Sequence, residues 1–204
     1  GNMKAAAVVG RNANATNNMQ GNYFGTAPFL VSPLKGIAKH THTKYADGNS
    51  LSTATQLAAT ADAVVLVVGL TSEAVHSPDE AEGHDRTSLT LPDNQDHYIA
   101  AVAKAAKAAD STKPVVLVIM GGGPVDVAQW RDSADVDAII WVGYPGQSGG
   151  DAIADVLFGV TVPSGKLTQT WYPQSFADKV SILDMGMRPN KATGNPGRSY
   201  RFYT

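Results

Sequence analysis

The feature that most constrains the fold is a set of short runs in which successive residues, rather than alternate ones, are apolar. Strands with that pattern are buried on both faces, as the strands of a parallel sheet are. The clearest runs are residues 4–10 (KAAAVVG), 63–70 (AVVLVVGL), 114–120 (PVVLVIM) and 137–143 (DAIIWVG). Residues 42–47 and 166–172 (KLTQTWY) are weaker candidates, and the second alternates as an edge strand does.

Segments with helical patterns separate these runs. Residues 93–109 are the longest, and Ser32-Pro33 provides an N-cap with proline at the first helical position. The other helical segments are residues 50–61, 125–131 and 149–158. The alternation predicts an α/β fold: a mostly parallel six-stranded sheet with helices on both faces, a three-layer α/β/α sandwich. We expect one domain over residues 1–204, with ligands at the carboxyl ends of the strands. Residues 181–204 show no periodicity and are expected to wrap over the surface or lead elsewhere.

Composition excludes several classes of partner. Hydrophobic residues make up 43% of the chain and charged residues 17%, which suits a continuous core. The 16 basic residues are spread along a chain of net charge -2, so no basic stripe favours nucleic acid. No apolar run has the length of a membrane span. The chain has no cysteine, which excludes disulfides and thiolate metal sites. Asn14-Ala15-Thr16 is a glycosylation sequon, relevant only in a secreted eukaryotic protein.

The segment after the third apolar run is long and acidic, which predicts a functional loop on the ligand side of the sheet. Its charged residues are Glu73, Asp79, Glu80, Glu82 and Asp85, with His76 and His84. A carboxylic acid among other carboxylates has a raised pKa, as a general acid near neutral pH requires. One alternative is a solvated loop with an Asp85–Arg86 ion pair. A metal site at His76 and His84 is another, although the spacing matches no defined pattern.

Glycine-rich loops follow three of the apolar runs, at residues 10–14, 121–124 and 143–150. Backbone amides in such loops can bind an anion at a helix N-terminus. None of the loops matches GxGxxG or GxxxxGK[ST], and tight turns with close packing explain the glycines. A nucleotide-binding domain is therefore the weaker alternative, and no cofactor is indicated.

Seven stretches resemble glycoside hydrolase family 3, the β-xylosidase and β-glucosidase group, in the order in which that family has them. They are VVGRNANATNNMQGNY, EAEGHDRTSLTLP, PVVLVIMGGGPVD, IWVGYPGQSGGD, PSGKLTQTWYP, DMGMRP and NPGRSYRFYT. The fourth and the last are most similar to the β-xylosidase branch. The resemblance covers nearly the whole chain and implies the C-terminal α/β sandwich domain of such an enzyme.

The resemblance implies a secreted, retaining, exo-acting β-xylosidase-like hydrolase of terminal β-linked sugars, without a cofactor. In that family an N-terminal barrel domain binds the sugar and supplies an aspartate nucleophile, and the sandwich domain contributes the general acid/base glutamate. The glutamate before glycine in the motif corresponds to Glu82, with Glu80 as the alternative and Glu73 a more distant one. Glu80 and His84 are also the residues expected to contact the substrate, a β-linked oligosaccharide or xyloside.

No barrel is recognisable in these 204 residues, so the nucleophile cannot be assigned within them. The isolated domain is therefore expected to be inactive until a barrel domain is supplied in cis or in trans. The competing hypothesis is a non-catalytic carbohydrate-binding or scaffold module with the same fold.

Overall fold

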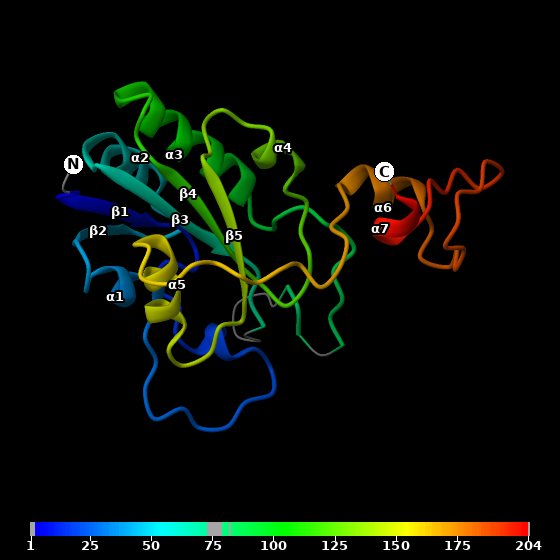
Figure 1. Cartoon of the computed structure of the whole chain (residues 1–204), viewed down its shortest axis with the longest axis horizontal. Helices are drawn as coiled ribbons and strands as arrows, with labels where there is room; N and C mark the ends of the chain where they lie inside the picture. The colour runs from blue at the N-terminus through cyan, green and yellow to red at the C-terminus, as the bar shows by residue number, and fades with distance from the viewer. Residues whose placement is uncertain (1–2, 73–78, 82, 204) are drawn as a thin grey trace.

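The computed structural model describes residues 3–72, 79–81 and 83–203 (Figure 1). Their centre is a five-stranded parallel sheet with the strand order β2-β1-β3-β4-β5. The strands are β1 (Ala5–Val9), β2 (His42–Ala46), β3 (Ala63–Gly69), β4 (Val115–Met120) and β5 (Ala138–Gly143). Five of the six predicted strands are confirmed, each within about two residues of the predicted bounds.

Helices cover both faces of the sheet, so the predicted three-layer sandwich is confirmed. Helices α1 (Pro33–Ile37) and α5 (Gly149–Leu157) pack on one face, and α2 (Leu51–Thr60) and α3 (Gln95–Ala109) pack on the other. The remaining helices are a 3-10 turn at Asn17–Gln20, α4 (Ala128–Arg131), α6 (Gln174–Lys179) and α7 (Ser199–Phe202). Among the described helices, none has the length and apolar character of a membrane span.

Strand β3 shows why the apolar runs are continuous. It lies in the middle of the sheet, and all seven of its residues are buried. Successive side chains of a strand point to opposite faces. Leu66 accordingly joins the core cluster under α2 and α3, and Val67 joins the cluster under α1 and α5. Both positions must be apolar because each face is covered.

Helices α1 and α5 meet through two glycines. Ser32 caps α1 by accepting a hydrogen bond from the backbone of Lys35 at 3.3 Å. A Cβ atom added at Gly36 would lie 2.0 Å from the carbonyl oxygen of Gly150, and one at Gly150 would lie 2.0 Å from that of Ser32. The contact therefore leaves no room for a side chain on either helix.

The sixth strand, predicted at residues 166–172, is not formed. The chain leaves α5 on one face of the sheet and crosses the edge of β5 instead of running beside it (Figure 1). Trp171 then packs edge-on against Trp141 on the other face, with ring centroids 5.7 Å apart. Leu167, the other apolar residue of the alternating pattern, is exposed, so the pattern does not mark a buried face of the segment.

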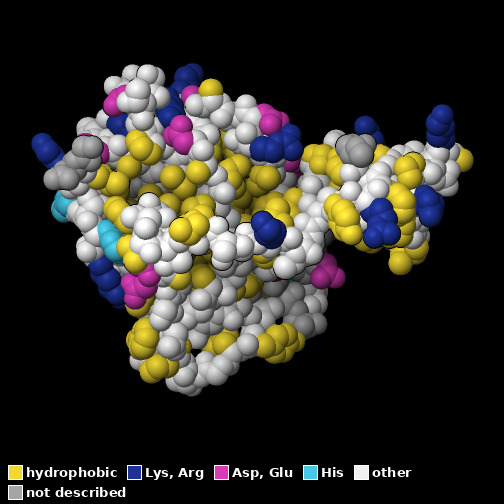
Figure 2. Space-filling view, in the orientation of Figure 1, with side chains coloured by type: hydrophobic (Ala, Val, Ile, Leu, Met, Phe, Trp, Pro, Cys, Tyr) yellow, Lys and Arg dark blue, Asp and Glu magenta, His cyan; other side chains and the backbone are white. Residues whose placement is uncertain are grey.

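Residues 174–203 form an arm that projects from the sandwich (Figures 1 and 2). Tyr172, Phe176 and Tyr203 stack together at its base, and Arg198 lies over the Phe176 ring at 5.5 Å. Gln174 fastens the arm to the sandwich: its side-chain oxygen accepts a hydrogen bond from the backbone of Leu89 at 2.6 Å. The aperiodic tail thus extends outward instead of wrapping over the sheet.

The glycine contact between α1 and α5 predicts that Gly150→Ala destabilises the fold. Alanine improves helix propensity by about 1 kcal/mol, but overpacking against backbone atoms costs about 1–3 kcal/mol. Because the added Cβ meets backbone that cannot rotate away, we expect a net loss of about 1–2 kcal/mol in the free energy of unfolding. Urea denaturation followed by circular dichroism measures it. Gly165→Ala is the matched control, since nothing lies within 4 Å of its added Cβ.

Candidate functional site

The acidic loop leaves the carboxyl end of β3, where two buried asparagines hold its base. The side-chain amides of Asn18 and Asn12 donate to the carbonyl oxygen of Leu70, at 3.0 and 3.3 Å. The side-chain oxygen of Asn18 accepts from the backbone N–H of Ser72 at 3.1 Å. Leu70 and Ser72, at the start of the loop, are thereby fixed to the segment that follows β1.

The chain returns to this base at Asp79. Its backbone N–H donates to the carbonyl of Thr71 at 3.0 Å, and its carboxylate accepts from the backbone of Thr71 at 3.1 Å. Arg11 lies 2.9 Å from the same carboxylate and 3.2 Å from that of Asp93. Burial raises the pKa of Asp79 above its usual value, although the charge of Arg11 opposes the shift. Arg11 therefore ties the loop base to the start of α3.

The next residue, Glu80, points its carboxylate toward the loops that follow β4 and β5. Its Oε2 accepts from the backbone N–H of Gly122 and from the hydroxyl of Tyr144, both at 2.8 Å. Its Oε1 lies 3.5 Å from the guanidinium of Arg86. Burial, and then the hydrogen bond to Glu80, raise the pKa of the Tyr144 hydroxyl. We call this group of Gly122, Tyr144 and Arg86 around the carboxylate the Glu80 seat.

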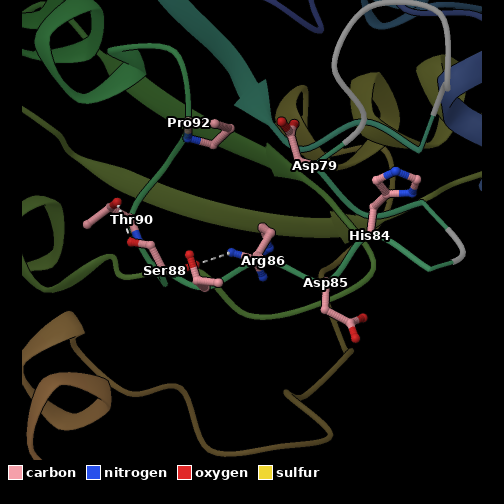
Figure 3. A pocket seen from close by; sticks show the side chains of 8 residues that line it. Asp79, His84, Asp85, Arg86, Ser88, Thr90 and Pro92 are labelled. Carbon is pink, nitrogen blue, oxygen red and sulfur yellow. Dashed lines mark hydrogen bonds between the residues drawn. The ribbon is translucent and has the colours of Figure 1, made fainter.

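The contacts of Arg86 differ from the ion pair with Asp85 that the sequence offered as an alternative. Within the described residues its ion pair is with Glu80, and not with the neighbouring Asp85. It also donates to the carbonyl oxygens of Pro124 at 3.0 Å and Ser88 at 3.2 Å. Figure 3 shows its guanidinium turned toward Ser88, while Asp85 points the other way.

Between Glu80 and Arg86 the chain makes a narrow tip. The backbone N–H of His84 donates to the carbonyl of Ala81 at 2.9 Å, forming an isolated antiparallel bridge. Two hollows of about 380 and 470 Å³ flank the tip, and His84, Asp85 and Arg86 line both of them. His84 and Asp85 are exposed (Figure 3). The tip therefore presents polar side chains to solvent on two sides.

Of the sequence-predicted site residues, Glu80 and His84 are placed at this tip. Glu82, Glu73 and His76 lie outside the described residues. Among the residues that are described, no group of three or more His, Asp or Glu side chains is arranged to hold a metal ion.

The glycine-rich loops already use the amides that an anion would need. Gly122 donates to Glu80, so this amide at the end of β4 faces a carboxylate of the chain itself. Gly10 donates to the carbonyl of Ala46, and Gly146 donates to that of Met19. These contacts argue against an anion at these three amides, and the positive φ of Gly10 and Gly146 explains those two glycines.

Sequence reasoning missed the roles of Tyr144 and Asn18. Tyr144 was visible only as part of a glycine-rich stretch, and its position directly after a strand was the available signal. Asn18 lies in an Asn-rich segment with no periodicity, and only its burial distinguishes it from the exposed Asn17.

Comparison with known proteins gives a consistent match over the whole chain. The model for "Glycosyl hydrolase family 3 C-terminal domain" matches residues 1–202. "Beta-D-xylosidase 3" of Arabidopsis thaliana is 48% identical over 209 residues, covering 99% of this chain and 26% of that protein. "Probable exo-1,4-beta-xylosidase xlnD" of Aspergillus japonicus is 42% identical, covering 100% of this chain and 26% of that protein. The chain thus spans about a quarter of the length of the curated relatives it matches.

Solved structures agree with the sequence matches. The structure of the GH3 exo-beta-xylosidase XlnD in complex with a xylobiose aziridine probe has a TM-score of 0.88 and 40% identity, covering 100% of this chain and 26% of that chain. Beta-D-glucoside glucohydrolase of Trichoderma reesei has a TM-score of 0.73 at 24% identity, covering 97% of this chain and 30% of that chain, and supports the fold alone.

The buried contacts of Asn18 predict that Asn18→Ala loosens the base of the acidic loop. The substitution leaves the buried N–H of Ser72 without its acceptor, which costs about 1–3 kcal/mol of unfolding free energy. Hydrogen exchange at the Ser72 amide, followed by NMR, should become faster by the factor that corresponds to this loss of free energy. Asn17→Ala is the control, because its side chain is exposed. Equal exchange rates in the two variants would contradict the role given to Asn18.

Proposed function

Because the chain belongs to the family of glycosyl hydrolase family 3 C-terminal domains, we propose that it acts within a larger retaining β-glycosidase that releases terminal β-linked sugars, with β-xylosides as the preferred substrates. The observation that carries this proposal is the family match over residues 1–202, together with 48% identity to a plant β-xylosidase. The substrate preference follows the names of the most similar relatives.

The proposed contribution of this domain is the general acid/base, supplied by Glu82. Retaining hydrolysis uses two carboxyl groups roughly 5 Å apart, one attacking the anomeric carbon and the other protonating the leaving oxygen. In the sequence Glu82 lies between Ala81 and Gly83, in the stretch whose residues His84 and Asp85 line both hollows. We propose that it protonates the leaving group of a sugar held by a facing domain, and that the exposed His84 is a sugar ligand.

The exposure of the tip supports the need for a second domain. His84 and Asp85 are exposed to solvent. We assign the nucleophile to none of the described carboxylates. Protonation of a leaving group is most effective where water is excluded. We therefore propose that a barrel domain, in cis or in trans, supplies the nucleophile and covers the tip, and that the isolated domain is inactive. On the family resemblance we also propose that the enzyme is secreted.

The proposal predicts a dependence on the leaving group. In a chimera, this chain replaces the matching quarter of the Arabidopsis β-D-xylosidase, and activity is measured on alkyl and aryl β-xylosides. General acid catalysis contributes about 10²–10⁴-fold, so Glu82→Gln should lower kcat/KM by about that factor on a poor leaving group such as an alkyl alcohol. A dinitrophenyl leaving group needs no proton and should lose far less.

Asp135→Asn is the control for this experiment, because Asp135 lies before β5, at the opposite edge of the sheet from the acidic loop. Equal losses on both leaving groups would remove Glu82 as the acid. Calorimetry with xylo-oligosaccharides tests the alternative of a non-catalytic module: binding by the 204-residue chain that Glu82→Gln does not alter, with no hydrolysis by the chimera, would favour it.

A further inference from the structure

The carboxylate of Glu80 joins three loops that follow three different strands. Glu80 itself comes from the loop after β3, Gly122 from the loop after β4 and Tyr144 from the loop after β5. The Glu80 side chain is only 18% exposed. Because both donors to Oε2 lie at 2.8 Å and Arg86 faces Oε1, each oxygen of the carboxylate already has a partner.

The glycine triplet at residues 121–123 is shaped around this carboxylate. A Cβ atom at Gly123 would lie 3.0 Å from Oε1 of Glu80. One at Gly122 would lie 3.3 Å from Oε2 and 3.2 Å from the ring of Tyr144. Neither glycine has a positive φ, so backbone conformation does not require them. These glycines provide space for the Glu80 side chain.

Arg86 fastens the other end of the same tip to the same loop. Its guanidinium donates to the carbonyl of Pro124 at 3.0 Å, directly after the glycine triplet. Residues 80 and 86 are therefore both attached to residues 122–124, and the tip between them is anchored at each end. The backbone bridge from His84 to Ala81 adds a further contact within this stretch.

We propose that Glu80 is a positioning residue, which acts through the Glu80 seat to hold Ala81 and residues 83–85, the neighbours in sequence of the proposed acid/base. This role rests on the proposed function of the domain. It differs from the two roles that the sequence suggested for Glu80, as an alternative acid and as a sugar ligand. A general acid must release a proton to the leaving oxygen, and a ligand must face the sugar, whereas both oxygens of Glu80 are turned to protein donors.

The seat itself is tested first in the 204-residue chain, by NMR of ring-labelled tyrosine. The raised pKa of Tyr144 means that the folded state keeps its proton to higher pH than the unfolded chain. Burial is the first cause of this shift and the hydrogen bond to Glu80 the second, so the stability linked to the protonated hydroxyl is present at neutral pH and is lost as pH rises through the raised pKa. We expect the Tyr144 signal, identified by its absence in Tyr144→Phe, to titrate later than ordinary tyrosines and to move toward them in Glu80→Gln.

Tyr98 is the internal control for this titration. Burial raises its pKa too, and its hydroxyl donates to the carbonyl of Asp47 at 2.8 Å, with no contact to Glu80. Glu80→Gln should leave the Tyr98 signal unchanged. A Tyr144 signal that does not respond to Glu80→Gln, or that shifts together with Tyr98, would overturn the seat.

The positioning role is then tested in the xylosidase chimera with two replacements of Glu80. Glutamine keeps an oxygen that accepts from Gly122 and Tyr144 but cannot donate a catalytic proton. We expect Glu80→Gln to keep kcat within about tenfold, and Glu80→Ala to lose about 10²-fold or more with little change in KM, as displacement of a catalytic group does. Equal losses of about 10²–10⁴-fold in both variants would instead make Glu80 the acid.

Gly123→Ala disturbs the seat without replacing Glu80, because its added Cβ meets the Glu80 carboxylate. It should lower kcat and accelerate exchange at the Gly122 amide, whereas Gly165→Ala should change neither, since its surroundings are open. A rise in KM alone in the Glu80 variants would make Glu80 a sugar ligand and overturn the positioning role. An inactive wild-type chimera combined with the expected tyrosine and exchange results would reject the proposed function and leave the seat standing.

Discussion

All strands of the sheet run in one direction, and every loop that follows a strand therefore leaves from the same edge. This constraint brings together residues that are far apart in the sequence. The loops after β3, β4 and β5 meet there because those strands are neighbours. The acidic loop, the glycine triplet and Tyr144 are in contact for that reason, and the candidate site is a property of the strand order as much as of any motif.

Most of the fold could be predicted because its signals are local. Runs such as AVVLVVG are apolar at every position, since both faces of β3 are covered, and Ser32-Pro33 marks the start of α1 through a bond made within one turn. The strand predicted at residues 166–172 is not formed, because pairing with a sheet depends on contacts that are not local in the sequence. The alternation of these residues indicates a strand, but Leu167 is exposed and Trp171 packs on Trp141 without joining the sheet, which nothing local in the sequence reveals.

The candidate site likewise has one part that local sequence predicts and another part that depends on tertiary contacts. The acidic loop and its position after β3 could be predicted, and a ligand role for His84 stays a prediction. The orientation of Glu80 could not be predicted, because it depends on donors that follow two other strands. The alternative of an Asp85–Arg86 ion pair is not observed, because the partners of Arg86 are the Glu80 carboxylate and the carbonyls of Ser88 and Pro124. Tertiary contacts decided each of these cases.

Because the glycine triplet fits closely around Glu80, substitutions at the two places affect each other. A side chain at position 123 and a long acidic side chain at position 80 compete for the same volume. A side chain added at position 123 therefore requires the Glu80 carboxylate to shift by a few tenths of an ångström. In sequences that share this fold, the two positions should vary together, so their covariation, more than the presence of glycines alone, would identify the chains that keep a carboxylate at this edge of the sheet.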